Sequence, residues 1–304
     1  MEFFRKGKNQ NYDLWSGYSW YVPGVAGMFA MLGWLLLGSV LGNVLSAILL
    51  LLPGMSGLSE YIMLIAYPVM FIPAMLYAKF RSNRDMMFEK GVAMDSGNFG
   101  RAGGLLAAGA AMLATVALAF NMDAVNRLMP PMPGWLETAL NSMVQGRFWV
   151  NFLSVSIFAP LFEEWLCRGI VLRGLLNAVR PDGSSVRPAW AIAASALFFA
   201  VIHMNPWQAI PAFALGCLFG YIYYRTGSLK LVMLMHFTNN TLTLLVSQCD
   251  ALKDAQTWLD VLPAQLYWIL FAAFCALLVL IVRMFARIPL SSPKGNCDVV
   301  EELF

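Results

Sequence analysis

The chain has 304 residues, of which 60% are hydrophobic and only 12% are charged. A soluble domain carries about 25% charged residues, so this composition excludes an ordinary water-soluble fold and indicates a membrane protein with several spans. The formal net charge of +3 is small, and no basic cluster or motif suggests nucleic-acid binding. The five cysteines are scattered, and their spacing predicts neither a disulfide framework nor a metal-binding CxxC pair.

Apolar runs along the chain predict an all-α membrane helix bundle with about eight transmembrane helices, because a spanning helix needs about 20 apolar residues. No stretch reads as a separate soluble part, so we expect a single membrane domain over residues 1–304. An amphipathic piece at 135–144 is expected to lie at the membrane surface before the fourth span. The expected spans are 24–52, 61–78, 103–120, 148–176, 189–203, 207–224, 231–246 and 266–285.

The distribution of basic residues predicts that both termini are cytoplasmic. Eight spans place the two ends of the chain on the same side of the membrane. With the N-terminus inside, 16 of the 20 Lys and Arg residues lie on the inner side. The outer loops then hold only Arg127, Arg147 and Lys253, and Arg168 lies within a span. This excess is the positive-inside pattern of a multi-pass membrane protein.

Two adjacent acids interrupt the fourth span, and a basic residue follows them. A charged side chain in the middle of a span costs about 2.5–3.5 kcal/mol on insertion scales, so such charges are usually paired and functional. Glu164 and Arg168 are four residues apart and share a helix face, which favours an ion pair. Glu163 is turned about 100° away and is left for chemistry. The structural alternative is a buried ion network that joins both acids to Arg168 and Arg173.

The chain has two histidines, and both lie in apolar segments. His203 follows Phe199 by four residues, and His236 shares a helix face with Asn240. These residues and Glu163 come from three spans, so they could surround one water-filled cavity. A carboxylate in a low-dielectric cavity is a suitable general base for water, and a histidine can position that water. A second histidine and an amide can donate to the oxyanion, at about 2.7–4 kcal/mol per donor.

The expected helix bounds set a geometric condition on this convergence. His203 lies near the outer end of its span, whereas His236 lies about 8–10 Å from the inner end of its own span. Unequal helix starts, strong tilt or a shifted fifth span must therefore bring the two rings together.

Three motifs, in this order along the chain, resemble the CPBP family of intramembrane proteases. That family includes the type II CAAX prenyl endopeptidases and the bacteriocin-processing and self-immunity (Abi) proteins. The motifs cover about 148–246, which we expect to be the catalytic core. They are Glu163-Glu164-Trp-Leu-Cys-Arg168, Phe199-Ala-Val-Ile-His203 and His236-Phe-Thr-Asn-Asn240.

The resemblance implies a glutamate-dependent intramembrane endopeptidase that acts on a peptide or protein substrate at the lipid bilayer. It implies that Glu163 and His203 activate water, and that His236 and Asn240 form the oxyanion hole. The residues expected to support this site are Glu164, Arg168 and Phe199.

No cofactor is expected to be required. The alternative is zinc held by Glu163, His203 and His236 with water in the fourth position, although the chain has no HExxH motif. Two other classes of function stay open: a non-enzymatic immunity or scaffold protein that binds a peptide in the same cavity, and a proton-coupled transporter that uses the buried acids and histidines as a relay. No inverted repeat supports the transporter. The motifs do not indicate whether the substrate is prenylated.

Overall fold

The structure is a computed structural model that describes residues 15–88, 90–144, 146–179, 183–249, 252, 255 and 257–300. It confirms the predicted all-α membrane helix bundle. Among the described residues, five helices are long and apolar enough to cross a bilayer. They are α1 (Val25–Leu51), α2 (Ser59–Asp85), α3 (Gly103–Asn126), α10 (Leu229–Ser247) and α11 (Ala264–Ala286).

Three further helical segments lie among these five and carry most of the predicted site. The first is continuous and alternates between α and π geometry: α5 (Phe148–Asn151), η4 (Phe152–Phe158), α6 (Ala159–Glu164), η5 (Trp165–Leu172) and α7 (Arg173–Asn177), with η4 and η5 as the π-helical parts. The other two are α8 (Pro188–Val201) and α9 (Pro206–Thr226). The expected spans thus correspond in order to helical segments. The amphipathic piece forms α4 (Gly134–Val144).

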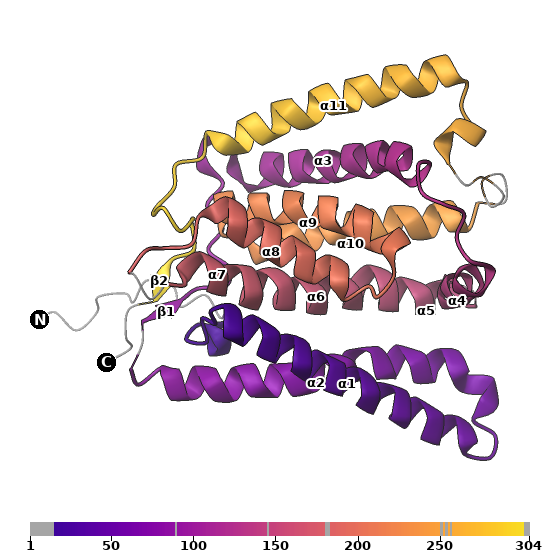
Figure 1. Ribbon diagram of the computed structural model, residues 1–304, viewed down its shortest axis with the longest axis horizontal. Coiled ribbons are helices and arrows are strands. Elements are labelled where there is room, and N and C mark those ends of the chain that lie inside the picture. The colour runs from indigo at the N-terminus through magenta and orange to yellow at the C-terminus, as the bar shows by residue number, and fades with distance from the viewer. Residues whose placement is uncertain are drawn as a thin grey trace, which may run out of the picture.

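The helices lie roughly lengthwise beside one another and form layers (Figure 1). The pair α1–α2 forms one side of the bundle, and α3 with α11 forms the opposite side. The segment from α5 to α7 lies between them together with α8, α9 and α10. The motif-bearing helices therefore occupy the centre of the molecule, where the remaining helices cover them.

Small residues allow the closest helix contacts. A Cβ atom at Gly38 of α1 would overlap the backbone carbonyl of Met70 in α2. A Cβ atom at Gly216 of α9 would lie 3.0 Å from the Cβ of Ala196 in α8. The second contact agrees with the sequence of α9, in which Ala212, Gly216 and Gly220 follow at four-residue spacing, a pattern typical of a close helix interface in membranes.

At one end of the bundle, short extended segments and one buried arginine join the helices. Strand β1 (Gly91–Val92) pairs antiparallel there with β2 (Val299–Val300), and this end is called the β1–β2 end below. The Val92 amide donates to the carbonyl of Ser19 at 2.9 Å, so the first and last described segments meet at one end of the bundle.

Arg173 stabilises this end of the bundle from within. Its guanidinium is buried and donates to the backbone carbonyls of Tyr18 at 2.9 Å and Tyr21 at 2.7 Å. The residue lies roughly 15 Å along the helical segment from Glu163. The alternative in which Arg173 joins the acidic pair is therefore wrong, because its side chain serves the N-terminal segment instead.

Candidate active site

Glu163 and Glu164 have different partners. Glu164 is fully buried, and its Oε1 accepts hydrogen bonds from Arg168 Nη1 and from His236 Nδ1, each at 2.8 Å. The expected ion pair with Arg168 is therefore present. Glu163 accepts a hydrogen bond at Oε1 from the Tyr67 hydroxyl at 2.6 Å. Its Oε2 is buried, lies 3.9 Å from His236 Nε2 and has no hydrogen-bond partner among the described residues.

Arg168 is fully buried, and both of its terminal nitrogens have partners, whereas its Nε has no hydrogen-bond partner among the described residues. Its Nη2 donates to the carbonyl of Gly216 at 3.0 Å. Its guanidinium carbon lies 4.7 Å from the ring centroid of Phe199 and 5.4 Å from that of Phe219, which are cation–π distances. A buried charge needs such compensation, so Arg168 both neutralises Glu164 and ties η5 to α8 and α9.

The two histidines converge because α8 is short. It has 14 residues, about 21 Å at 1.5 Å per residue, whereas the hydrocarbon core is about 30 Å thick. His203 follows the end of α8, and its side chain is half-buried. The ring of Phe199 lies between the two histidines, 4.9 Å from His203 and 5.5 Å from His236 by ring centroids. The short α8 thus brings His203 and His236 to the same phenylalanine ring, as the sequence analysis required for a shared site.

The hydrogen-bond network assigns the tautomers of both rings. His203 Nδ1 lies 2.8 Å from the carbonyl of Phe199. A carbonyl only accepts, so Nδ1 carries the hydrogen and Nε2 of the neutral ring keeps its lone pair. His236 Nδ1 donates in the same way to Glu164. His236 can therefore donate from Nε2 only as an imidazolium, next to two carboxylates and Arg168.

The turn between α8 and α9 fixes His203. Asn205 donates from Nδ2 to the His203 carbonyl at 2.9 Å, and its Oδ1 caps α9 by accepting from the Gln208 amide. Met204 adopts the left-handed backbone region with a φ of 57°. Such a conformation is uncommon for a residue other than glycine and marks a tightly constrained turn.

Glu163 and His203 line the same cavity, which has a volume of about 220 Å³. This volume holds several water molecules. The remaining wall is almost entirely apolar and comes from α1, α2 and the end of α8. The mouth includes Leu36, Val201 and Met204, which are exposed on the surface of the bundle. The other lining residues are Leu32, Leu35, Ser39, Met70, Phe71 and Ile202.

Asn240 lies one turn after His236 on α10. Its Nδ2 donates to the carbonyl of Val155 at 2.9 Å, and its Oδ1 accepts from Asn239 at 3.1 Å. An amide NH2 has two hydrogens, so the second can still donate. The contact with Val155 ties α10 to η4.

The two π-helical segments enclose the acidic pair, and the sequence analysis did not identify them. Each offers a backbone carbonyl to a neighbouring helix: Val155 of η4 to Asn240, and Cys167 of η5 to the hydroxyl of Ser195 at 2.7 Å. A π turn breaks the regular i→i+4 pattern and is frequent at functional sites. Here it links the acid-bearing segment to α8 and α10, the two helices that position the histidines.

No group of three His, Cys, Asp or Glu side chains within the described ranges has positions that could hold a metal ion. Glu163, His203 and His236, the alternative zinc set, do not form such a group. The described cysteines are all free.

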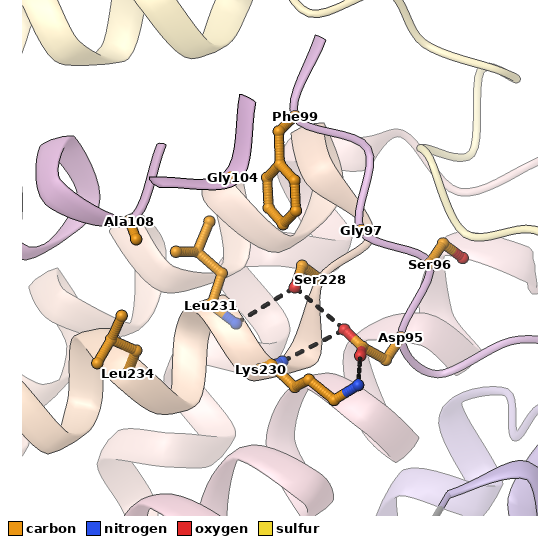
Figure 2. Close-up of a pocket in the computed structure, with 10 residues that line it drawn as sticks. All are labelled: Asp95, Ser96, Gly97, Phe99, Gly104, Ala108, Ser228, Lys230, Leu231 and Leu234. Carbon is orange, nitrogen blue, oxygen red and sulfur yellow. Dashed lines mark hydrogen bonds and ion pairs between the residues drawn. The ribbon is translucent and has the colours of Figure 1, made fainter. Parts of the chain in front are cut away.

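A second cavity of about 390 Å³ lies at the start of α10 (Figure 2). Asp95 accepts there from the hydroxyl of Ser228 at 3.0 Å and from Lys230 Nζ at 2.9 Å. Ser228 in turn caps α10 by accepting from the Leu231 amide. These contacts fix the start of the helix that carries His236, and none of the predicted site residues lines this cavity.

Comparison with family models matches residues 145–242 to the family described as type II CAAX prenyl endopeptidase Rce1-like. The matched segment covers about a third of the chain and contains all three motifs. This match confirms the family resemblance drawn from the motifs and supports an integral membrane protease of the CAAX type. No curated protein and no solved structure matched the chain.

Proposed function

We propose, from the Rce1-like segment and the geometry around its buried acids, that this protein is an intramembrane endopeptidase that uses Glu163 as a general base. The observation that carries the proposal is the shared cavity of Glu163 and His203. A water molecule there can contact both an ionised carboxylate and the lone pair of His203 Nε2. This arrangement suits activation of water for attack on an amide.

The reaction proceeds by direct attack of water on the scissile carbonyl. As the water oxygen bonds to the carbonyl carbon, one of its protons passes to Glu163 Oε2. The carbonyl π electrons move to oxygen and form a tetrahedral oxyanion. When the C–N bond breaks, the proton passes from Glu163 to the leaving nitrogen, and the oxyanion electrons restore the carbonyl of the new carboxylic acid. Glu163 is then regenerated as a carboxylate.

His236 and Asn240 stabilise the oxyanion in this proposal. Glu164 holds the His236 ring through Nδ1, so the protonated ring presents its Nε2 hydrogen towards the reaction centre. Asn240 lies on the same face of α10 and supplies its second amide hydrogen. Preorganised donors of this kind act most strongly where water is scarce.

The substrate in this proposal is a peptide held at the membrane with an apolar group near the scissile bond. The apolar wall and the mouth beside Leu36, Val201 and Met204 support this choice, because exposed apolar residues on a membrane helix bundle face lipid. The description of the matched family names prenylated CAAX substrates, and such a peptide carries an apolar group of this kind.

The test uses purified protein in liposomes with two fluorogenic CAAX peptides, one farnesylated and one not. We expect cleavage by wild type, with the farnesylated peptide preferred, and a loss of about 100-fold or more in His203→Ala and in His236→Ala. Met87→Ala, at an exposed position just after α2 that does not line the cavity, serves as the control and should keep its activity. Wild-type cellular function in the double-histidine variant would instead favour a scaffold that binds a peptide without cutting it.

A further inference from the structure

Tyr67 contacts the proposed base from a helix that lies outside the matched segment. It belongs to α2, 96 positions before Glu163, and its hydroxyl donates to Glu163 Oε1 at 2.6 Å. This distance is in the range of strong hydrogen bonds from a hydroxyl to a carboxylate. None of the three motifs includes this residue.

The contact makes the two oxygens of Glu163 unequal. Oε1 is occupied by Tyr67, whereas Oε2 is buried and has no hydrogen-bond partner among the described residues. A buried carboxylate oxygen without a donor is costly, so a water that reached Oε2 from the cavity would supply the donor that it lacks. Glu164 Oε2 is also buried without a partner among the described residues, but Glu164 does not line the cavity. Oε2 is also the oxygen that faces His236 Nε2, at 3.9 Å.

A column of aromatic rings holds Tyr67 in place. Its ring lies 5.7 Å from that of Phe71, which stacks at 5.2 Å on the ring of Phe162. Phe162 directly precedes Glu163, so the column joins α2 to the turn of α6 that carries the acid. Phe71 is fully buried and also lines the cavity. The tyrosine hydroxyl is therefore fixed relative to the carboxylate.

We propose that Tyr67 is a positioning residue for peptide hydrolysis, which holds Oε1 of Glu163 so that Oε2 takes the proton from water. The inference rests on the proposed function of Glu163. The tyrosine keeps its own proton throughout the reaction. Its hydroxyl donates to Oε1 and so stabilises the ionised carboxylate.

Other groups also act on Glu163. His236 faces it from α10, and His203 shares its cavity from the turn after α8. Glu164 and Arg168 on the same helical segment pair with each other, and Cys167 lies one turn further on. The cavity wall from α1 carries no ionisable side chain. The substitution Tyr67→Phe leaves all these groups in place and removes only the hydroxyl that donates to Glu163.

The test compares Tyr67→Phe with wild type through the pH dependence of kcat/KM on the cleaved reporter peptide. Loss of the donor destabilises the ionised form of Glu163, so the acid limb should move to higher pH by about one unit. At the acid end of the range this amounts to about a tenfold loss in rate. Tyr77→Phe is the matched control, because Tyr77 lies on the same helix and its hydroxyl contacts Arg81 rather than Glu163. It should keep the wild-type profile.

A second variant applies the opposite change. Incorporation of 3-fluorotyrosine at position 67 makes the hydroxyl a stronger donor with little change in shape, and it should move the acid limb to lower pH. If the acid limb moves to higher pH in Tyr67→Phe and to lower pH with 3-fluorotyrosine, the positioning role of Tyr67 is supported. A packing defect would not shift the acid limb in opposite directions in the two variants. If neither variant moves the limb while Glu163→Gln is inactive, the role of Tyr67 is wrong and the proposed function stands. If Glu163→Gln cleaves like wild type, the proposed function itself fails, and this inference fails with it.

Discussion

Glu163 and Glu164 are adjacent in the sequence, and helix geometry directs their side chains to different surroundings. Glu164 points to Arg168 and His236 and is fully enclosed. Glu163 points to Tyr67 and to the cavity that also holds His203. Glu164 therefore balances a buried positive charge, whereas Glu163 lines the cavity in which a ligand could bind. The assignment of Glu163 as base and Glu164 as support depends on this division.

The division predicts that the same substitution lowers stability by different amounts at the two positions. Glu164→Gln leaves Arg168 as a buried charge without its carboxylate, which should cost roughly 3–5 kcal/mol of unfolding free energy. Glu163→Gln keeps a polar group that can still accept from Tyr67, so it should cost much less. Unfolding of the two purified variants in the same detergent measures this difference. Equal stability of the two variants would contradict the assignment.

The polar motif residues could be predicted from the sequence because each one lies in an apolar segment. A polar side chain there raises the free energy of membrane insertion, so its presence indicates a partner or a function. Tyr67 could not be predicted in this way. A tyrosine in a membrane helix is common, and its contact with Glu163 depends on how α2 packs against α6. The carbonyl of Gly216 was missed as a partner of Arg168 for a related reason, since backbone acceptors carry no signature in the sequence.

The helices show which elements a hydropathy pattern can define. The expected spans correspond to helical segments within a few residues at most ends, because long apolar runs leave little choice in a bilayer. The π-helical segments η4 and η5 could not be predicted, because their residues also suit an α-helix. The pairing of β1 with β2 was also missed, since each strand has only two residues. The short length of α8 could be predicted, although its consequence for the depth of His203 became clear only from the packing.

The contact between α1 and α2 can be tested through a pair of glycines on one helix. Gly38→Ala should separate the helices and lower both thermal stability and activity, because its Cβ would overlap the Met70 carbonyl and Met70 lines the cavity. Gly33→Ala, on an open part of α1, should leave both unchanged or slightly raise stability, since alanine favours a helix. Detergent melting curves and reporter cleavage follow both effects. Equal behaviour of the two variants would show that the contact at Gly38 does not hold α1 in place.

At the scale of the whole molecule, the bundle places the proposed chemistry between two covering layers. The pair α1–α2 contributes one wall of the cavity, and α8 with its turn contributes the other. The first and last described segments meet at the β1–β2 end of the bundle through β1. This arrangement agrees with an even number of crossings. The cytoplasmic location of that end remains a prediction from the basic residues.

Cysteine labelling in intact and permeabilised cells tests the orientation. Cys249 is exposed just after α10, at the end of the bundle opposite β1 and β2. In a protein with Cys249 as its single cysteine, an impermeant maleimide should label intact cells from outside. In a protein with Cys297 as its single cysteine, which lies near β2, the maleimide should label the thiol only after the cells are permeabilised. The reverse pattern would place the termini outside.

The same experiment includes a pH dependence. Burial raises the pKa of the Cys297 thiol, although a hydrogen bond with Tyr223 acts in the other direction. The thiolate is the reactive form, so labelling of Cys297 in permeabilised cells should stay slow near neutral pH and accelerate as the pH rises. Rapid labelling at neutral pH would contradict the raised pKa of this half-buried thiol.

The most direct measurement of the central claim is the single-turnover rate of Glu163→Gln in liposomes, on the reporter peptide that wild type cleaves best. Glu137→Gln makes the same substitution at an exposed site on α4 and serves as the control. If Glu163 is the base that activates water, its variant should lose roughly 100-fold to 10,000-fold in rate while it keeps the wild-type melting temperature. The control should match wild type. A folded Glu163→Gln protein that cleaves within about twofold of the wild-type rate would contradict the account.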